Sequence, residues 1–103
     1  MDNQKNRFDA PHFVAMTLVK QAKDEAFSMT DYIQHKAYYH QPEMKNKVVF
    51  YGEVLNQATI YIVIYVKSDE EFEQIIINDP GINARLYELK TITPFNSNVI
   101  ETA

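Results

Sequence analysis

The 103-residue chain is predicted to form one α+β domain whose elements follow the order β-α-β-β-α-β. Four segments rich in β-branched and aromatic residues indicate strands. Two segments with helical spacing separate the first strand from the second and the third from the fourth. The second and third strands are separated by only a few residues, which is typical of a hairpin. This order predicts a ferredoxin-like subunit with a four-stranded antiparallel sheet.

The first strand is expected at residues 12–20 and the first helix at residues 29–41. Ser28 and Asp31 are three residues apart and approximate a capping box at the start of the helix. Pro42 should end or kink the helix, because proline lacks an amide donor and clashes with the preceding turn. Apolar residues at every fourth position are expected to form the buried face of this helix: Met29, Ile33 and Ala37.

The remaining strands are expected at residues 47–55, 59–67 and 86–93. The first two should form a hairpin through the short "NQA" connection. The third follows the sequence "NDPG", whose residue types indicate a turn.

The second helix is expected to run from Ser68 to about Asn78. Ser68 and Glu71 form a capping box, and the acidic residues of the first turn complement the positive end of the helix dipole. Three apolar residues are predicted to share its buried face: Phe72, Ile75 and Ile76.

The predicted strands are apolar on both sides, which is unusual for a sheet with helices on a single face. In the third strand Ile60 and Ile62 alternate with Tyr61 and Val63, so neither side is clearly polar. The first strand shows the same pattern. We therefore expect the second face to be covered by another copy of the chain, giving a homodimer. The alternative is that the terminal segments of the same chain cover it.

The composition excludes several classes of function. The net charge is -4 and the ten basic residues are scattered, which disfavours nucleic acid and anionic membranes as partners. The chain has no cysteine, which excludes disulfides, thiolate catalysis and cysteine-ligated zinc. It also has no apolar run typical of a signal peptide or a membrane span, so a cytoplasmic protein is expected. Residues 1–10 are predicted to be a flexible segment preceding the domain at residues 11–103.

Three histidines are candidates for chemistry. His12 lies at the edge of a predicted strand, where a structural role explains it. His40 lies in the last turn of the first helix, where a cation complements the helix dipole. His35 lies in the middle of that helix, with Tyr32 three residues before it and Tyr39 four residues after it. A helical histidine of this kind is more often structural than catalytic, so both roles stay open at this point.

No pattern supports a metal site or a serine nucleophile. His35 and His40 are five residues apart and do not share one helical face, and no acidic residue completes a set of ligands. With only Gly52 and Gly81 in the chain, neither a nucleophile elbow nor a glycine-rich phosphate loop can form. We expect no metal and no organic cofactor.

Asp79 has two interpretations. Aspartate before Pro80 is common in turns, because proline restricts the preceding residue to extended geometry. Alternatively, the turn directs the Asp79 carboxylate towards His35, where it would set the tautomer of the ring. Spacing alone does not decide whether the two side chains meet.

The segment "NDPGINARLYELKTITPF" resembles the C-terminal signature of the YciI-related (YCII domain) family. That signature has an Asp-Pro, here Asp79 and Pro80, and a strand ending in Pro-Phe, here Pro94 and Phe95. The family also has a histidine on the first helix and a later glycine, and His35 and Gly52 fit that interval. The resemblance covers residues 13–95.

The resemblance implies a ferredoxin-like subunit that pairs into a dimeric α/β barrel, with a His-Asp dyad, here His35 and Asp79. Some members of the family take part in the breakdown of chlorinated aromatic compounds. Related dimeric barrels include muconolactone isomerases and small monooxygenases. The chain departs from the pattern at Asn46 and Glu53, where the family often has glycine and proline, and at Pro42, which is unusual within the first helix.

We therefore expect a small enzyme that performs acid/base chemistry on a small organic molecule, with aromatic and carbonyl compounds as candidates. His35 is the predicted acid/base and Asp79 its orienting partner. Three tyrosines are predicted to bind the substrate: Tyr32, Tyr39 and Tyr87. Lyase, isomerase and hydrolase reactions all remain open. The alternative is a non-catalytic dimeric domain that binds a ligand or regulates a partner. A cofactor-free monooxygenase is a third reading, which no residue of the chain selects.

Overall fold

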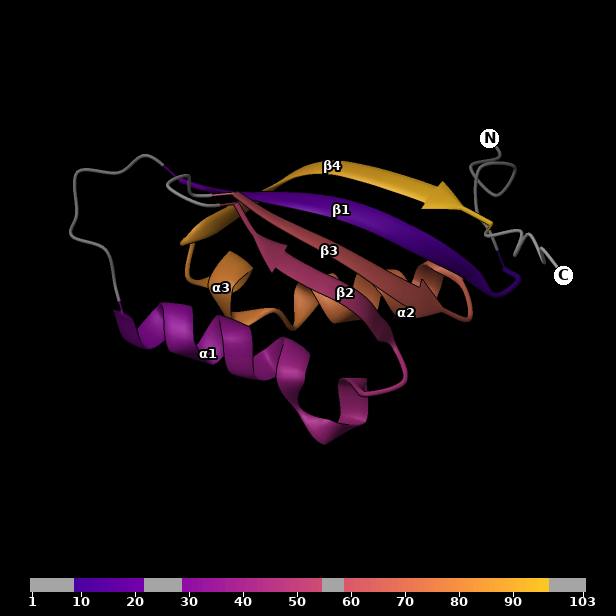
Figure 1. The fold of residues 1–103 in the computed structure, drawn as a ribbon, viewed down its shortest axis with the longest axis horizontal. Coiled ribbons are helices and arrows are strands. Elements are labelled where there is room, and N and C mark those ends of the chain that lie inside the picture. The colour runs from indigo at the N-terminus through magenta and orange to yellow at the C-terminus, as the bar shows by residue number, and fades with distance from the viewer. Residues whose placement is uncertain (1–8, 22–28, 55–58, 97–103) are drawn as a thin grey trace, which may run out of the picture.

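The computed structural model describes residues 9–21, 29–54 and 59–96, and it confirms the predicted α+β fold. Four strands form one antiparallel sheet in the order β2-β3-β1-β4, the order of a ferredoxin-like fold. The helices all lie against one face of this sheet, and the other face is open (Figure 1). Most of the predicted N-terminal segment, the capping residue Ser28 and the "NQA" connection lie outside the described residues.

Strand β1, His12–Lys20, occupies the predicted residues and pairs with strands on both sides. Strand β3, Thr59–Val66, pairs with β1 and with β2, Val48–Glu53. Strand β4, Tyr87–Phe95, pairs with the other side of β1 and extends two residues further than predicted. Among the described residues, β2 and β4 are therefore the edge strands, each paired on one side only.

The central strands supply the core on the side that faces the helices. Alternate residues of β1 and β3 are 2% exposed or less, namely Val14, Met16, Leu18, Ile60, Ile62, Ile64 and Val66. These residues are paired across the two strands, for example Leu18 with Ile60 and Met16 with Ile62, so their side chains project to the same face. The predicted strand faces are therefore confirmed.

Helix α1, Met29–His40, presents a different face to the sheet from the one predicted. Met29 and Ile33 are 58% and 56% exposed, so the prediction that they form the core face is wrong. The buried residues are instead His35 and Tyr39. An aromatic stripe can occupy a buried face when its polar atoms find partners there, and apolar spacing alone does not detect such a stripe.

The predicted end of α1 is confirmed at Pro42. The helix ends at His40, and Pro42 begins a short 3-10 helix, η2, Pro42–Met44. Met44 is buried and joins the core from this turn.

Helix α2, Asp69–Ile77, has the predicted cap. The Ser68 hydroxyl accepts a hydrogen bond from the backbone amide of Glu71, and Phe72 and Ile75 are buried. The Glu71 carboxylate accepts from the backbone amide of Lys67 at 2.6 Å and pairs with Lys47 at 2.9 Å. Burial alone raises the pKa of Glu71, but these two donors outweigh it and hold the pKa below its usual value.

The segment predicted as an "NDPG" turn contains a short helix, α3, Pro80–Asn83. Asp79 is its N-cap and Pro80 its first residue, which are the preferred residue types at these positions. At the other end, the amide of Leu86 donates to the carbonyl of Gly81 and Arg85 has φ 62°, the geometry of a Schellman cap. The sequence predicted only a turn here, whereas the structure has one turn of helix.

Two matched substitutions test which residues form the core. Ile62→Ala should cost about 2–5 kcal/mol of unfolding free energy, because it removes a fully buried side chain. Ile33→Ala should change it by less than about 0.5 kcal/mol, because that side chain is largely exposed. Denaturant unfolding of both variants measures the difference, and equal costs would contradict the packing of α1.

Candidate functional site

The cap of α3 places the Asp79 carboxylate in the interior. Its side chain is 0% exposed, and Oδ1 accepts hydrogen bonds from the backbone amides of Gly81 at 2.7 Å and Ile82 at 3.3 Å. A buried carboxylate requires such donors, since an unpaired charge in a low-dielectric interior is very costly. The same conformation of Asp79 therefore both caps α3 and directs the carboxylate into the interior.

The structure brings together the predicted pair, His35 and Asp79. Nδ1 of His35 lies 3.0 Å from Oδ1 of Asp79, and both side chains are 0% exposed. A carboxylate that already accepts amide protons acts as an acceptor here, so we assign the proton to Nδ1. Nε2 then carries the lone pair in the neutral ring.

Tyr39 completes the set of donors to the carboxylate. Its hydroxyl donates to Oδ2 of Asp79 at 2.7 Å. Burial, and then the nearby charge of Asp79, raise the pKa of Tyr39 far above its usual value, so the phenol remains a donor. Tyr39 was predicted to bind substrate, but its hydroxyl is directed to Asp79 and the residue supports the dyad.

Aromatic rings surround His35 on its other sides. The ring centre of Tyr87 lies 4.7 Å from that of His35, and that of Tyr51 lies 6.0 Å away. Tyr87 was predicted for the site, whereas Tyr51 was not. The signal for Tyr51 was its register, because it pairs with the buried residue Ile62 and so projects to the side of the helices.

The surface side of this cluster is formed by Tyr32 and Glu53. The Tyr32 hydroxyl donates to the Glu53 carboxylate at 2.8 Å, and the Lys36 ammonium lies 3.9 Å from the same oxygen. Burial raises the pKa of Tyr87 to about 12, with further contributions from Tyr32 and Glu53. Glu53 therefore places a negative charge next to the aromatic cluster.

Two buried polar atoms near the dyad have no hydrogen-bond partner among the described residues. They are Nε2 of His35 and the hydroxyl of Tyr51. Leaving such groups unpaired costs free energy, and structures keep few of them. Both atoms belong to the aromatic cluster around His35.

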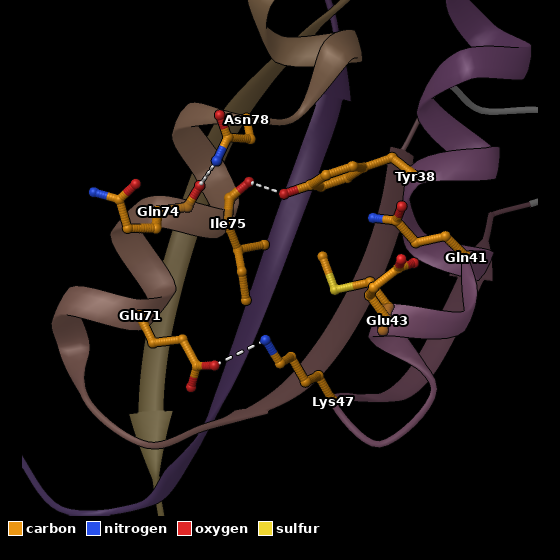
Figure 2. A pocket seen from close by; sticks show the side chains of 9 residues that line it. Tyr38, Gln41, Glu43, Lys47, Glu71, Gln74, Ile75 and Asn78 are labelled. Atoms are coloured by element: carbon orange, nitrogen blue, oxygen red, sulfur yellow. Dashed lines mark hydrogen bonds and ion pairs between the residues drawn. The ribbon is translucent and has the colours of Figure 1, made fainter.

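Two pockets lie on the helix side of the fold, next to the cluster. One, of about 290 Å³, lies between α1, η2 and α2, where Lys47 pairs with Glu71 and the Tyr38 hydroxyl donates to the carbonyl of Ile75 (Figure 2). The other, of about 490 Å³, is bordered by Tyr39 and Pro42. Neither of these two is lined by His35, so they adjoin the dyad without reaching its ring.

The other two histidines have complete local roles. His12 is buried, with Nδ1 2.7 Å from the carbonyl of Ala10 and Nε2 3.1 Å from the Asp69 carboxylate. His40 is exposed, and its Nδ1 donates to the carbonyl of Lys36 at 2.7 Å in the last turn of α1. The dyad histidine differs from both because one of its nitrogens is buried and has no hydrogen-bond partner among the described residues.

No protein-family model matches the chain, and no curated protein is significantly similar to it in sequence. The resemblance to the YciI-related family thus stays a prediction. Within residues 9–21, 29–54 and 59–96, no helix is long and apolar enough to cross a membrane. Over the same residues, no group of three or more histidine and acidic side chains could hold a metal ion.

Gly81 allows α3 to approach His35. A Cβ atom at position 81 would lie 2.8 Å from Nδ1 and 2.9 Å from Cβ of His35, closer than real contacts allow. A Cβ at Gly52 would also be close, at 2.7 Å from the ring of Phe50, but that ring is 53% exposed and can turn away. The two glycines of the chain therefore form a matched pair.

We predict that Gly81→Ala costs about 1–3 kcal/mol of unfolding free energy, because α3 or the His35 ring must shift. Gly52→Ala should change it by less than about 1 kcal/mol. Denaturant unfolding measures both values, and NMR spectra of His35 should change in the first variant only. An unchanged His35 spectrum in Gly81→Ala would contradict the close packing of the dyad against α3.

Proposed function

We propose that the protein is an enzyme of the YciI-like type, in which His35 is the acid/base group and Asp79 orients it. The hydrogen bond between Nδ1 of His35 and Oδ1 of Asp79 carries this proposal, because it leaves Nε2 as the basic atom. The substrate is a small organic molecule with an aromatic or carbonyl group. No metal or organic cofactor is needed for this chemistry, and the cytoplasm is the proposed location.

The chemistry follows from the surroundings of the ring. Nε2 takes a proton from the substrate, and the resulting imidazolium is stabilised by the buried carboxylate of Asp79. Tyr39 and the two amides of α3 hold that carboxylate in place, so the ring keeps one orientation and one tautomer. Delivery of the proton to a different carbon of the substrate completes an isomerisation, and its transfer to a departing group completes an elimination.

One observation favours a second candidate, a non-catalytic ligand-binding or regulatory domain. The His35 side chain is 0% exposed, whereas a catalytic ring must contact its substrate. Access would run past the hydrogen bond between Tyr32 and Glu53, which is exposed to solvent and therefore contributes little stability. In the second candidate, the dyad is a buried structural element and performs no proton transfer.

Exchange of carbon-bound protons separates the two candidates. Acetophenone is neutral, aromatic and enolisable, and NMR in D₂O follows the loss of its methyl protons. We expect the wild type to accelerate the exchange and His35→Gln to reduce that acceleration by about 100-fold or more. Asp79→Asn should reduce it by about 10-fold or more, although asparagine still caps α3.

His12→Gln is the matched control, because the ring of His12 bonds to Ala10 and Asp69 and not to the aromatic cluster around His35. It should exchange acetophenone at the wild-type rate. If His35→Gln and the wild type gave the same rate, the proposed enzyme would be wrong. Binding of acetophenone without exchange would support the ligand-binding domain instead.

We also propose that the protein is a homodimer formed through the open face of the sheet. Large side chains on this face are exposed, including Phe50 at 53% and Tyr61 at 49%. Phe13 lies between Tyr65 and Phe95, with ring centres 4.9 Å and 5.4 Å from theirs. A contiguous aromatic face on a sheet typically marks an interface, and a second copy presents the complementary surface by symmetry.

Light scattering after gel filtration tests the dimer. We expect the wild type to have twice the mass of one chain and Tyr65→Glu to shift to a single chain, because it places a charge in the apolar interface. Ile33→Glu, on the exposed side of α1, is the control and should remain dimeric. A monomeric wild type at micromolar concentration would instead favour coverage of this face by the terminal segments.

A further inference from the structure

The two unpaired polar atoms next to the dyad point to a site for one ligand group. Nε2 of His35 and the Tyr51 hydroxyl are each buried and without a hydrogen-bond partner among the described residues. Their rings belong to the same cluster, with centres 6.0 Å apart and planes inclined by 45°. Asp79 bonds to Nδ1 of the His35 ring, so Nε2 faces away from the carboxylate.

We propose that Tyr51 is the second polar group of the site and that, with His35, it binds a neutral ligand carrying a carbonyl oxygen. The Tyr51 hydroxyl donates to that oxygen, and Nε2 of His35 faces the adjacent carbon–hydrogen bond. This inference rests on the proposed acid/base function, and it adds a residue and a substrate class to it.

The proposed step balances without a further reactant. Nε2 removes the proton from the carbon next to the carbonyl, and the electron pair of the carbon–hydrogen bond moves into an enolate. The developing charge on the oxygen is stabilised by the Tyr51 hydrogen bond, which is stronger to an anion than to a neutral carbonyl. The proton then returns from the imidazolium to carbon, which regenerates the neutral ring.

The charges around the site favour a neutral ligand. The carboxylate of Asp79 accepts from His35 and Tyr39, and that of Glu53 accepts from Tyr32. The Lys36 ammonium lies 3.9 Å from Glu53 at the surface. Burial, and then the charge of Glu53, raise the pKa of Tyr51 above its usual range, so its hydroxyl stays protonated as a donor. The negative charges of Asp79 and Glu53 also oppose the entry of a carboxylate or phosphate.

The test compares Tyr51→Phe with Tyr61→Phe. Tyr61 lies on the neighbouring strand and on the open face of the sheet, so the same atom is removed at a position outside the site. Binding of acetophenone is titrated by NMR through the signals of His35, with benzoate as the anionic counterpart of similar shape. Denaturant unfolding of each variant is measured in parallel.

We expect Tyr51→Phe to weaken acetophenone binding by about 3- to 10-fold, the effect of losing one hydrogen-bond donor. Its denaturation midpoint should equal or exceed that of the wild type, because the hydroxyl has no protein partner to lose. Tyr61→Phe should bind like the wild type, and benzoate should bind the wild type at least about 10-fold more weakly than acetophenone does.

The inference is overturned if Tyr51→Phe binds acetophenone like the wild type, if benzoate binds as well as acetophenone, or if the wild type binds neither. A lower denaturation midpoint in Tyr51→Phe would also overturn it, because the hydroxyl would then have a structural partner. Proton exchange that requires His35 but not Tyr51 leaves the proposed function standing without this inference. Binding of acetophenone that depends on Tyr51 but occurs without proton exchange would support the Tyr51 site and contradict the proposed enzyme.

Discussion

The buried carboxylate of Asp79 organises the helix side of this protein, because it accepts hydrogen bonds from groups that are far apart in the sequence. His35 and Tyr39 come from α1, and the amides of Gly81 and Ile82 come from α3. A charged group in the interior is stable only with such donors around it. The position of α1 against the sheet, the cap of α3 and the orientation of the histidine ring therefore depend on one another.

This arrangement explains why the capping and orienting roles of Asp79 do not compete. The extended backbone that Pro80 imposes on Asp79 is the geometry of an N-cap, and the cap directs the side chain towards α1. Gly81 then lets the ring of His35 pack against the helix it helps to anchor. The residues that begin helix α3 thus also orient the ring of His35.

The strands, their order and the capped helix α2 could be predicted from the sequence, because alternation and capping are local signals. The buried face of α1 could not, since Met29 and Ile33 have the spacing of a core face but are exposed. What selects the other face is the partner of His35, which lies 44 residues away in the sequence. Tyr51 was missed for a related reason, because its place in the site follows from pairing with β3 and contact with α1. The short helix α3, by contrast, had a readable signal in Asp79 followed by Pro80.

The surface charges around Tyr32 act on the buried aromatic cluster. Glu53 forms a hydrogen bond with Tyr32 and lies close to Lys36 at the surface, while its charge acts on the buried tyrosines. The protein thereby places a buried ring nitrogen of His35, unpaired among the described residues, near the negative charges of Asp79 and Glu53. Such a surrounding disfavours anionic ligands.

The tautomer of His35 shows whether Asp79 orients the ring through Nδ1. It is measured by ¹⁵N NMR of the three imidazole rings in the wild type. We predict that Nδ1 of His35 carries the proton and that Nε2 is unprotonated when the ring is neutral. A neutral His35 protonated at Nε2 in the wild type would contradict it, because Asp79 would then not orient the ring and the basic atom would face the carboxylate.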